Sequence, residues 1–153
     1  MSMHRVSVHI MRDGNCLIRC LAHFLYKDEH KHWLVRKQIV NAVVDKWAEY
    51  APFIIGDVAN NARITNSFEY KSYMSRNGVF GAAEEIQAFT AMNLMEISIF
   101  QEGFQAPQKF GDNKNRNKLV LLLSGRIDHG HYDIITCWNS NLNKRKKNFK
   151  NYY

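Results

Sequence analysis

The sequence predicts a single α+β domain, and three observations support that prediction. A length of 153 residues with 46% hydrophobic content suits one core that buries about two thirds of the unfolded chain's surface. Hydrophobic residues recur at helical spacing through most of the first 92 positions. Apolar runs of strand length then follow, and neither an internal repeat nor a domain linker interrupts the chain.

The first 25 residues predict a strand followed by a helix. Val6, Val8 and Ile10 alternate with polar residues, the period of a half-buried strand. The turn-like segment 13–15 comes next, and Asn15 stands where an N-cap residue is favoured for a helix that begins near Cys16. Along this helix one apolar stripe is expected to face the core: Leu17, Cys20, Leu21, Phe24 and Leu25.

Three further helices are expected before the sheet. The second runs over 32–50, is stopped by Pro52, and repeats Trp33, Arg36, Val40, Val43, Val44 and Trp47 at helical spacing. The third covers 68–75 and ends at the Asn77-Gly78 turn. The fourth covers 82–92, with Ile86 and Phe89 facing inward.

The remaining sequence predicts a sheet of three or more strands. Met95, Ile97 and Ile99 alternate as a strand, and the polar segment 101–118 is expected to be a loop. The continuous apolar run 119–123 indicates a central strand buried on both faces. A last strand is expected over 131–138.

Charge and cysteine usage narrow the class of protein. The net charge is +7, but the segment 139–153 holds five basic and no acidic residues, which leaves 16 basic against 14 acidic residues elsewhere. We therefore expect a nearly neutral domain over 1–138 and a basic, flexible tail over 139–153. Cys16, Cys20 and Cys137 form an odd set without paired spacing, which argues against a disulfide framework or a zinc site.

No targeting or membrane segment is expected. Basic residues interrupt the apolar residues of the first twelve positions, unlike a signal peptide, and no later run approaches the roughly 20 apolar residues of a membrane span. With its cysteines reduced, the protein is expected in the cytoplasm, or in the host-cell cytoplasm if a virus or pathogen encodes it.

Cys16 is the candidate nucleophile. In the first turn of a helix, unpaired backbone N–H groups and the positive end of the dipole favour a thiolate. The backbone of Gly14, Asn15 and Cys16 can also face the oxyanion that forms when a thiolate attacks a carbonyl. A cysteine at a helix start is, by itself, more commonly a core residue, as we expect for Cys20 and Cys137.

His131 is the candidate base. Asp133 follows two residues later on a predicted strand, so both side chains share one face and the carboxylate can orient the imidazole. His23 lies on the helix of Cys16 at a distance of about 10 Å, out of hydrogen-bonding reach. His4, His9, His30 and His32 have no evident orienting partner, and His129 is the alternative base.

These residues together resemble the ovarian-tumour (OTU) family of cysteine proteases. Asp13-Gly14-Asn15-Cys16-Leu17-Ile18-Arg19 resembles the family's Asp-Gly-Asn-Cys-Leu-Phe-Arg motif, and His131-Tyr132-Asp133 resembles its His-Tyr-Asp element. Between them, His32 with Val35-Arg36 resembles the helix that follows the nucleophile. Segments 70–74 and 78–85 resemble its Tyr-x-x-x-Met and Trp-Gly-Gly-x-x-Glu elements, except that Phe80 replaces Trp and Ala82 replaces the second Gly. The resemblance spans 5–138.

The resemblance implies a papain-like OTU fold, with a small central, mostly antiparallel sheet packed between helices. It also implies a deubiquitinase that needs no cofactor or metal and cleaves the isopeptide bond after the Gly-Gly tail of ubiquitin or a ubiquitin-like modifier. Cys16 would attack, His131 would act as base, Asp133 would orient it and Asp13 would shape the oxyanion loop. The implied substrate channel contains Phe80, Gly81, Ala82 and Tyr132.

The expected partner is ubiquitin or polyubiquitin, or another ubiquitin-like modifier. The protein is expected to be a monomer, and neither a membrane nor a nucleic acid is expected as a partner. Two alternatives remain open at this point. One is a module that binds ubiquitin without cleaving it. The other is a nucleic-acid binder that uses the basic tail.

Overall fold

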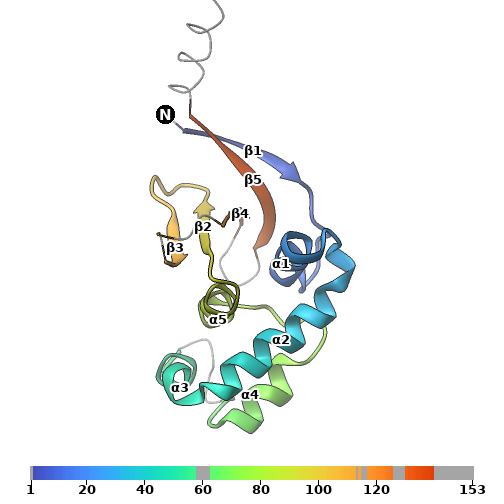
Figure 1. Ribbon diagram of the computed structural model, residues 1–153, viewed down its shortest axis with the longest axis vertical. Coiled ribbons are helices and arrows are strands. Elements are labelled where there is room, and N and C mark those ends of the chain that lie inside the picture. Colours follow the sequence, from blue (N-terminus) through green and yellow to red (C-terminus); the bar gives the residue numbers. More distant parts are fainter. Residues whose placement is uncertain (1, 58–62, 113, 115–116, 126–129, 140–153) are drawn as a thin grey trace, which may run out of the picture.

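The computed structural model describes residues 2–57, 63–112, 114, 117–125 and 130–139, and it confirms the α+β class (Figure 1). The predicted tail lies outside these residues except for Asn139. In chain order the elements are β1 (Ser2–Val8), α1 (Cys16–Tyr26), a 3-10 turn (Glu29–Lys31), α2 (His32–Asp45), α3 (Trp47–Ile55), α4 (Ser67–Met74), α5 (Ala83–Asn93), β2 (Glu96–Gln101), β3 (Gln108–Gly111), β4 (Lys118–Ser124) and β5 (His131–Asn139). None of the helices described is both long and apolar enough to cross a bilayer.

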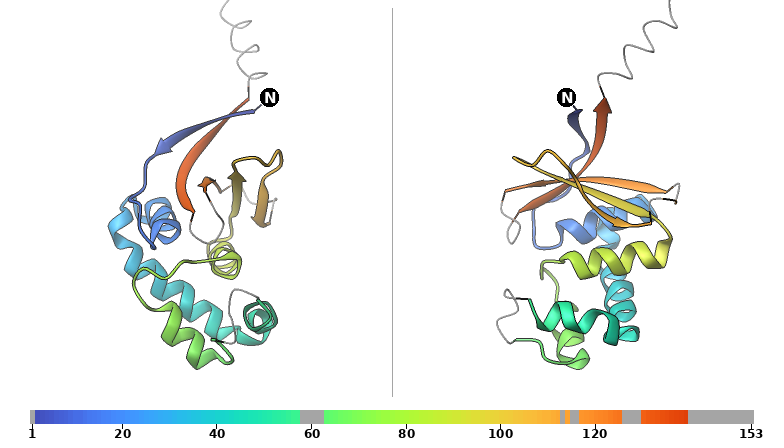
Figure 2. Two further views of the ribbon diagram at one scale, coloured as in Figure 1. Left: turned by 180° about the vertical axis from the view of Figure 1, so that it is seen from behind. Right: turned by 90° about the vertical axis from the view of Figure 1, so that its left-hand side faces the viewer.

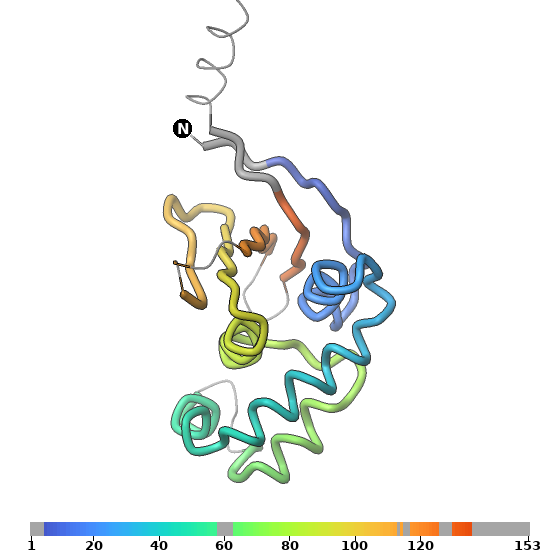
Figure 3. Tube along the Cα trace, viewed as in Figure 1, coloured from blue at the N-terminus to red at the C-terminus, as the bar shows by residue number. Residues whose placement is uncertain are grey.

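The sheet has five strands in the order β1-β5-β4-β2-β3. Three of the four pairings are antiparallel, and only β2 with β4 is parallel, so the sheet is mostly antiparallel as predicted. The first and last strands of the chain pair along their length, and Figure 3 shows the two segments running side by side. This pairing brings the start of the chain next to the strand that carries His131 and Asp133.

The helices described lie on one side of the sheet in the views of Figures 1 and 2, so the sheet is not packed between helices as the resemblance implied. Helix α1 packs against β5, and α5 packs against β2 and β3. Helix α2 contacts both of these helices and also α4. Helix α1 is therefore enclosed between the sheet and α2, and every residue from Cys16 to Ala22 is buried, not only the predicted stripe.

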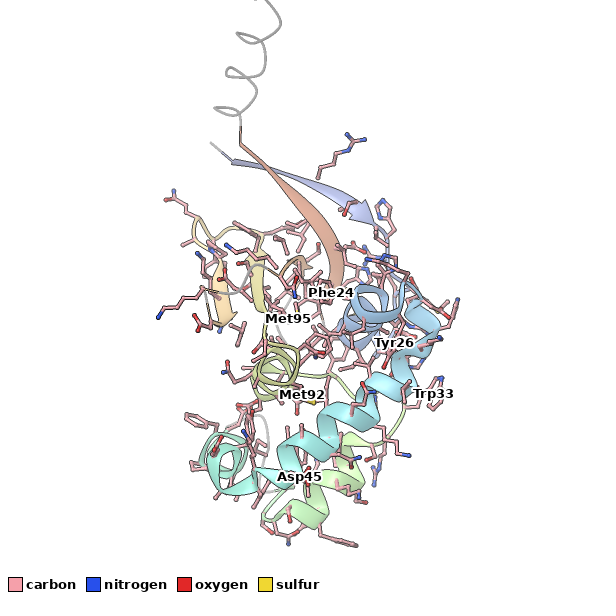
Figure 4. The ribbon with its side chains drawn as sticks, viewed as in Figure 1. Phe24, Tyr26, Trp33, Asp45, Met92 and Met95 are labelled. Atoms are coloured by element: carbon pink, nitrogen blue, oxygen red, sulfur yellow. The ribbon has the colours of Figure 1, made fainter. Side chains whose placement is uncertain are left out.

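The predicted second helix is two helices. The chain breaks at Lys46, with φ −117° and ψ 37°, and α3 starts at Trp47. Pro52 does not stop a helix, because it lies inside α3, where it removes one backbone donor while the buried side chains of Tyr50 and Ile54 hold the helix in place. Trp33 belongs to the predicted helical repeat, but its side chain is 63% exposed and projects from α2 (Figure 4).

Two expectations about the sheet also need correction. The predicted loop 101–118 contains β3, whose four residues include one buried side chain, Phe110, and so carry no alternating signal. Strand β4 is central, as predicted, but it is not buried equally on both faces. Leu119, Leu121 and Leu123 are buried, and the alternate side chains are half-buried.

Candidate active site

Cys16 is the first residue of α1 and lies against the start of β5. Its thiol donates to the carbonyl of Gly130, with Sγ 3.9 Å from the oxygen, and Gly130 directly precedes β5. One helical turn further on, the Cys20 thiol donates to the Tyr132 carbonyl at 3.5 Å. The packing of α1 on β5 thus joins segments more than 110 residues apart, and it leaves the Cys16 side chain buried, with 1% of its residue surface exposed.

His131 and Asp133 form the bonded pair predicted from their spacing. Nε2 of His131 lies 2.9 Å from Oδ1 of Asp133, and both residues are buried. A carboxylate oxygen can only accept a hydrogen bond, so Nε2 carries the proton and Nδ1 is left as the nitrogen that can exchange a proton with a thiol. His129, the alternative base, lies outside the described residues.

Asp133 is itself held by the segment that follows β1. The backbone N–H of Ile10 donates to the same Oδ1 at 2.9 Å, in a buried position. This contact depends on the pairing of β1 with β5, so nothing near His131 in the sequence points to it. Ile10 is therefore a residue of the site that the sequence did not predict.

Asp13 shapes the loop before Cys16 through an ion pair with Arg19. Its carboxylate accepts hydrogen bonds from Arg19 Nη2 at 2.8 Å and from the Asn15 backbone N–H at 2.9 Å. Partial burial raises the pKa of Asp13, but Arg19 and the Asn15 N–H outweigh it, so that the pKa lies below its ordinary value. The arrangement agrees with the loop-shaping role implied by the resemblance.

Asn15 occupies the predicted N-cap position but does not cap the helix. Its side chain makes no cap hydrogen bond to α1, because Oδ1 accepts from the Gly78 N–H at 2.8 Å and from Arg36 at 3.0 Å. Nδ2 donates to Asn77 Oδ1 at 3.0 Å. The Asn15 side chain therefore does not occupy the first-turn N–H groups of α1. The Asn15 N–H nevertheless donates to the Asp13 carboxylate and the Cys16 N–H to the Asp13 carbonyl at 3.2 Å, so an oxyanion would compete with Asp13 for these two donors.

A groove with a cavity volume of about 1030 Å³ lies beside this loop. All four predicted channel residues line it: Phe80, Gly81, Ala82 and Tyr132. Tyr132 lies between the two residues of the bonded pair and joins the groove to β5, and burial raises the pKa of its phenol to about 12. Neither Cys16 nor His131 lines the groove itself. A Cβ on Gly81 would lie 3.0 Å from the Leu17 side chain, so this part of the groove wall packs on the start of α1.

A sequence profile described as OTU-like cysteine protease matches residues 11–132. The chain belongs to this family. OTU domain-containing protein 1 of Mus musculus is 40% identical over 134 residues, which are 83% of this chain but 27% of the mouse protein. The chain thus spans about a quarter of the length of the curated relatives it first matches.

Solved OTU domains share the fold. The OTU domain of OTUD1 superposes with a TM-score of 0.63 at 25% identity, covering 88% of this chain and 85% of that one. The Hazara virus OTU bound to ubiquitin superposes with a TM-score of 0.62 at 22% identity, covering 90% and 83% of the two chains. The predicted OTU fold is therefore confirmed.

The pKa of the Cys16 thiol differs from what its place at a helix start led us to expect. The helix start was expected to favour a thiolate, yet burial raises the pKa of Cys16 above its ordinary value, and the charge of Asp13 adds to that rise. Backbone hydrogen bonds from Tyr132 and Leu17 lower the pKa, as expected of a helix start, but by less than burial raises it.

No group of three metal-binding side chains lies together among the residues described.

Proposed function

We propose that this OTU domain is a thiol-dependent deubiquitinase that hydrolyses the isopeptide bond after the C-terminal Gly-Gly of ubiquitin or a ubiquitin-like modifier. The observation that carries the proposal is the meeting of Cys16 with the start of β5, whose His131–Asp133 pair is bonded at 2.9 Å. Family membership supports the protease chemistry, and a structural neighbour bound to ubiquitin supports the partner.

The proposed reaction uses only groups of this chain. Sγ of Cys16 attacks the carbonyl carbon of the terminal glycine, and its proton passes to Nδ1 of His131. Backbone N–H groups of 14–16 stabilise the oxyanion, for which those of Asn15 and Cys16 exchange their bonds to Asp13. His131 then gives the proton to the leaving lysine amine, and a thioester remains on Cys16.

Water completes the cycle. His131 takes a proton from water as the water oxygen attacks the thioester carbonyl; the C–S bond then breaks, and the modifier departs as a carboxylic acid that ionises in solvent. The thiol is restored when the proton returns to sulfur. Asp133, held by the Ile10 N–H, keeps Nε2 protonated and Nδ1 available through both halves of the reaction.

The groove suits an extended tail that ends in two glycines. Two glycines have no side chains to accommodate, and the groove is lined by Phe80, Gly81 and Ala82. Ala82 places a methyl group where the family pattern has glycine, so this difference bears on how a substrate fits the groove. The exposed Phe104, which also lines the groove, belongs to the β2–β3 connection, the type of surface segment on which a choice between modifiers depends.

A ubiquitin that carries a cysteine-reactive group at its C-terminus tests the proposal. The wild-type protein is expected to form one covalent adduct, visible by mass spectrometry, and Cys16→Ala is expected to form none. Cys20→Ala removes a second buried thiol from the same helix and should retain the reaction. Equal reaction of wild type and Cys16→Ala would exclude Cys16 as nucleophile.

The same preparations separate the remaining alternatives. Turnover of a ubiquitin substrate should fall about 100-fold or more in His131→Ala and stay near wild type in His129→Ala, because a positioned general base contributes about that factor. The reverse result would move the base to His129. Binding of ubiquitin without adduct or cleavage by the wild type would establish the non-catalytic module instead.

A further inference from the structure

Arg36 is a buried cation that touches three separate segments of the chain. It lies on α2 with 4% of its surface exposed. Nη1 donates to the Met74 carbonyl at 3.0 Å, and Nη2 donates to the Val79 carbonyl at 2.8 Å and to Asn15 Oδ1 at 3.0 Å. One side chain therefore bonds the end of α4, the connection between α4 and α5, and the loop that carries Cys16.

The two loops are also in direct contact with each other. Oδ1 of Asn15 accepts from the Gly78 N–H in addition to Arg36, and Nδ2 of Asn15 donates to Asn77. At Gly14 any Cβ would collide with the Gly78 carbonyl, so the two backbones pack without a side chain between them. The position of the nucleophile loop is thus set by residues 77–79 as much as by its own sequence.

The cost of burying the Arg36 guanidinium indicates that it serves to position other groups more than to stabilise the fold. Taking a guanidinium out of water is costly, and a well-packed apolar side chain of similar volume is often at least as stable. Burial does lower the pKa of Arg36. In return, the planar guanidinium offers several donors at fixed angles, which no apolar side chain can replace. The three oxygens that it bonds are all neutral, so each bond fixes a position of the backbone or of Asn15.

We propose that Arg36 is a positioning residue for the reaction at Cys16, an inference that rests on the proposed function. It keeps the backbone N–H groups of 14–16 aimed at the developing oxyanion, and it keeps the groove wall at 79–82 in register with the nucleophile. Arg36 is not itself a groove-lining residue, and it bonds only the backbone carbonyls of two that are, Met74 and Val79, so its loss removes no substrate contact. Its loss should therefore lower kcat rather than raise KM.

Steady-state kinetics with a ubiquitin bearing a fluorogenic C-terminal amide test this inference. Arg36→Lys keeps the charge but cannot reach three acceptors from one ammonium, and it should lower kcat by about 10- to 100-fold while KM stays within about threefold. The matched control is Arg76→Lys, an exposed arginine next to the same connection whose contact is the Tyr73 ring. The control should stay within about twofold of wild type. Equal kcat in the two variants, or a loss confined to KM, would overturn the proposal.

Hydrogen–deuterium exchange gives a readout that needs no substrate. In Arg36→Lys the amides of 13–17 and 77–82 should exchange faster than in wild type, and those of 119–123 in the central strand should not change. This result is expected even if the domain cleaves no ubiquitin, so it separates this inference from the proposed function. Unchanged exchange in both loops would show that Arg36 does not hold them.

A second variant covers the case in which Arg36→Lys does not fold. Asn77 is exposed, and its Oδ1 accepts one hydrogen bond of the same contact from Asn15 Nδ2. Asn77→Ala should lower kcat by about two- to fivefold and speed exchange over 13–17, because one neutral hydrogen bond is lost instead of three charge-assisted ones. Wild-type kcat and exchange in Asn77→Ala would contradict the proposal.

Discussion

Two effects act on the thiol proton of Cys16 in the free protein. Burial raises the pKa, whereas backbone hydrogen bonds from Leu17 and Tyr132 lower it, and burial is the larger effect. The resting thiol is therefore neutral over a wider range of pH than an exposed cysteine. In the proposed reaction the thiol therefore gives its proton to His131 during attack.

Alkylation of Cys16 is expected to reflect this raised pKa. Because a raised pKa reduces the thiolate fraction at neutral pH, the rate with iodoacetamide should rise with a midpoint at higher pH in the folded protein than in urea. Trypsin releases Cys16 in the peptide Asp13–Arg19 and Cys20 in Cys20–Lys27, so mass spectrometry follows each thiol separately. Cys20, whose pKa burial raises well above the ordinary value, should react still later. A folded midpoint below the unfolded one would contradict the burial argument.

The sequence predicted where the proposed catalytic residues lie in the fold but not which residues hold them. Cys16, His131 and Asp133 stand in local patterns, a helix start and a strand pair, that report their own geometry. Ile10 and Arg36 act through contacts with segments far away in the chain, and such contacts leave no local pattern. The same limit explains Asn15, which has the local features of a cap but bonds Gly78 and Arg36 instead.

Helices α4 and α5 are joined by a buried carboxylate. Oε2 of Glu85 accepts from the Ala82 N–H at the start of α5, and Oε1 accepts from the Tyr70 hydroxyl of α4 at 2.9 Å. Both residues are buried, and burial raises the pKa of Glu85 above its ordinary value. This bond fixes the far end of the connection whose middle contacts Asn15.

Tyr70→Phe is expected to lower the free energy of unfolding by about 1–3 kcal/mol at pH 7, because it leaves a buried carboxylate oxygen unpaired. A carboxyl whose pKa is raised by folding stabilises the fold below its unfolded pKa and loses that contribution as pH rises through the folded value. The cost of Tyr70→Phe should therefore shrink toward pH 4.5, the ordinary pKa of Glu85. Urea denaturation of wild type and variant at pH 7 and at pH 4.5 measures this difference in the free energy of unfolding. Tyr73→Phe, which loses a bond at the surface, serves as the control and should change stability by less than about 0.5 kcal/mol.

Periodicity predicted the elements that have one clear buried face. Helices α1, α4 and α5 and strands β1, β2, β4 and β5 all lie within a few residues of their predicted positions. The pattern failed where tertiary contacts replace it. Strand β3 has only four residues, and only Phe110 is buried, so it shows no alternation of apolar and polar side chains. The break between α2 and α3 falls at Lys46, where no glycine or proline marks the end of a helix.

The first and last strands described, β1 and β5, pair with each other in the sheet. Residues of β1 pair with those of β5 from Ser2 with Asn139 to Val8 with Ile134, and β5 ends where the described part of the chain ends. The site therefore draws on both ends of the domain. The basic segment that follows β5 adds five positive charges to a domain with nearly balanced charge.

Removal of residues 140–153 is expected to leave ubiquitin hydrolysis within about twofold of wild type, because β5 remains whole. Salt-dependent retention on immobilised RNA should fall, since counterion release scales with the number of cationic contacts. Glutamine at the five basic positions 144–147 and 150 keeps the length and removes the charge, and it should reproduce the loss of retention. A large drop in hydrolysis by either variant would assign the segment to substrate binding.

The close approach of Gly14 to the Gly78 carbonyl limits how this domain can be engineered. A graft of the Asp13–Cys16 motif onto another scaffold would carry these residues without the backbone against which they pack. Directed evolution of the α4–α5 connection, aimed at a new modifier, would likewise disturb the loop before Cys16. Libraries that vary the two loops together are the practical unit of redesign.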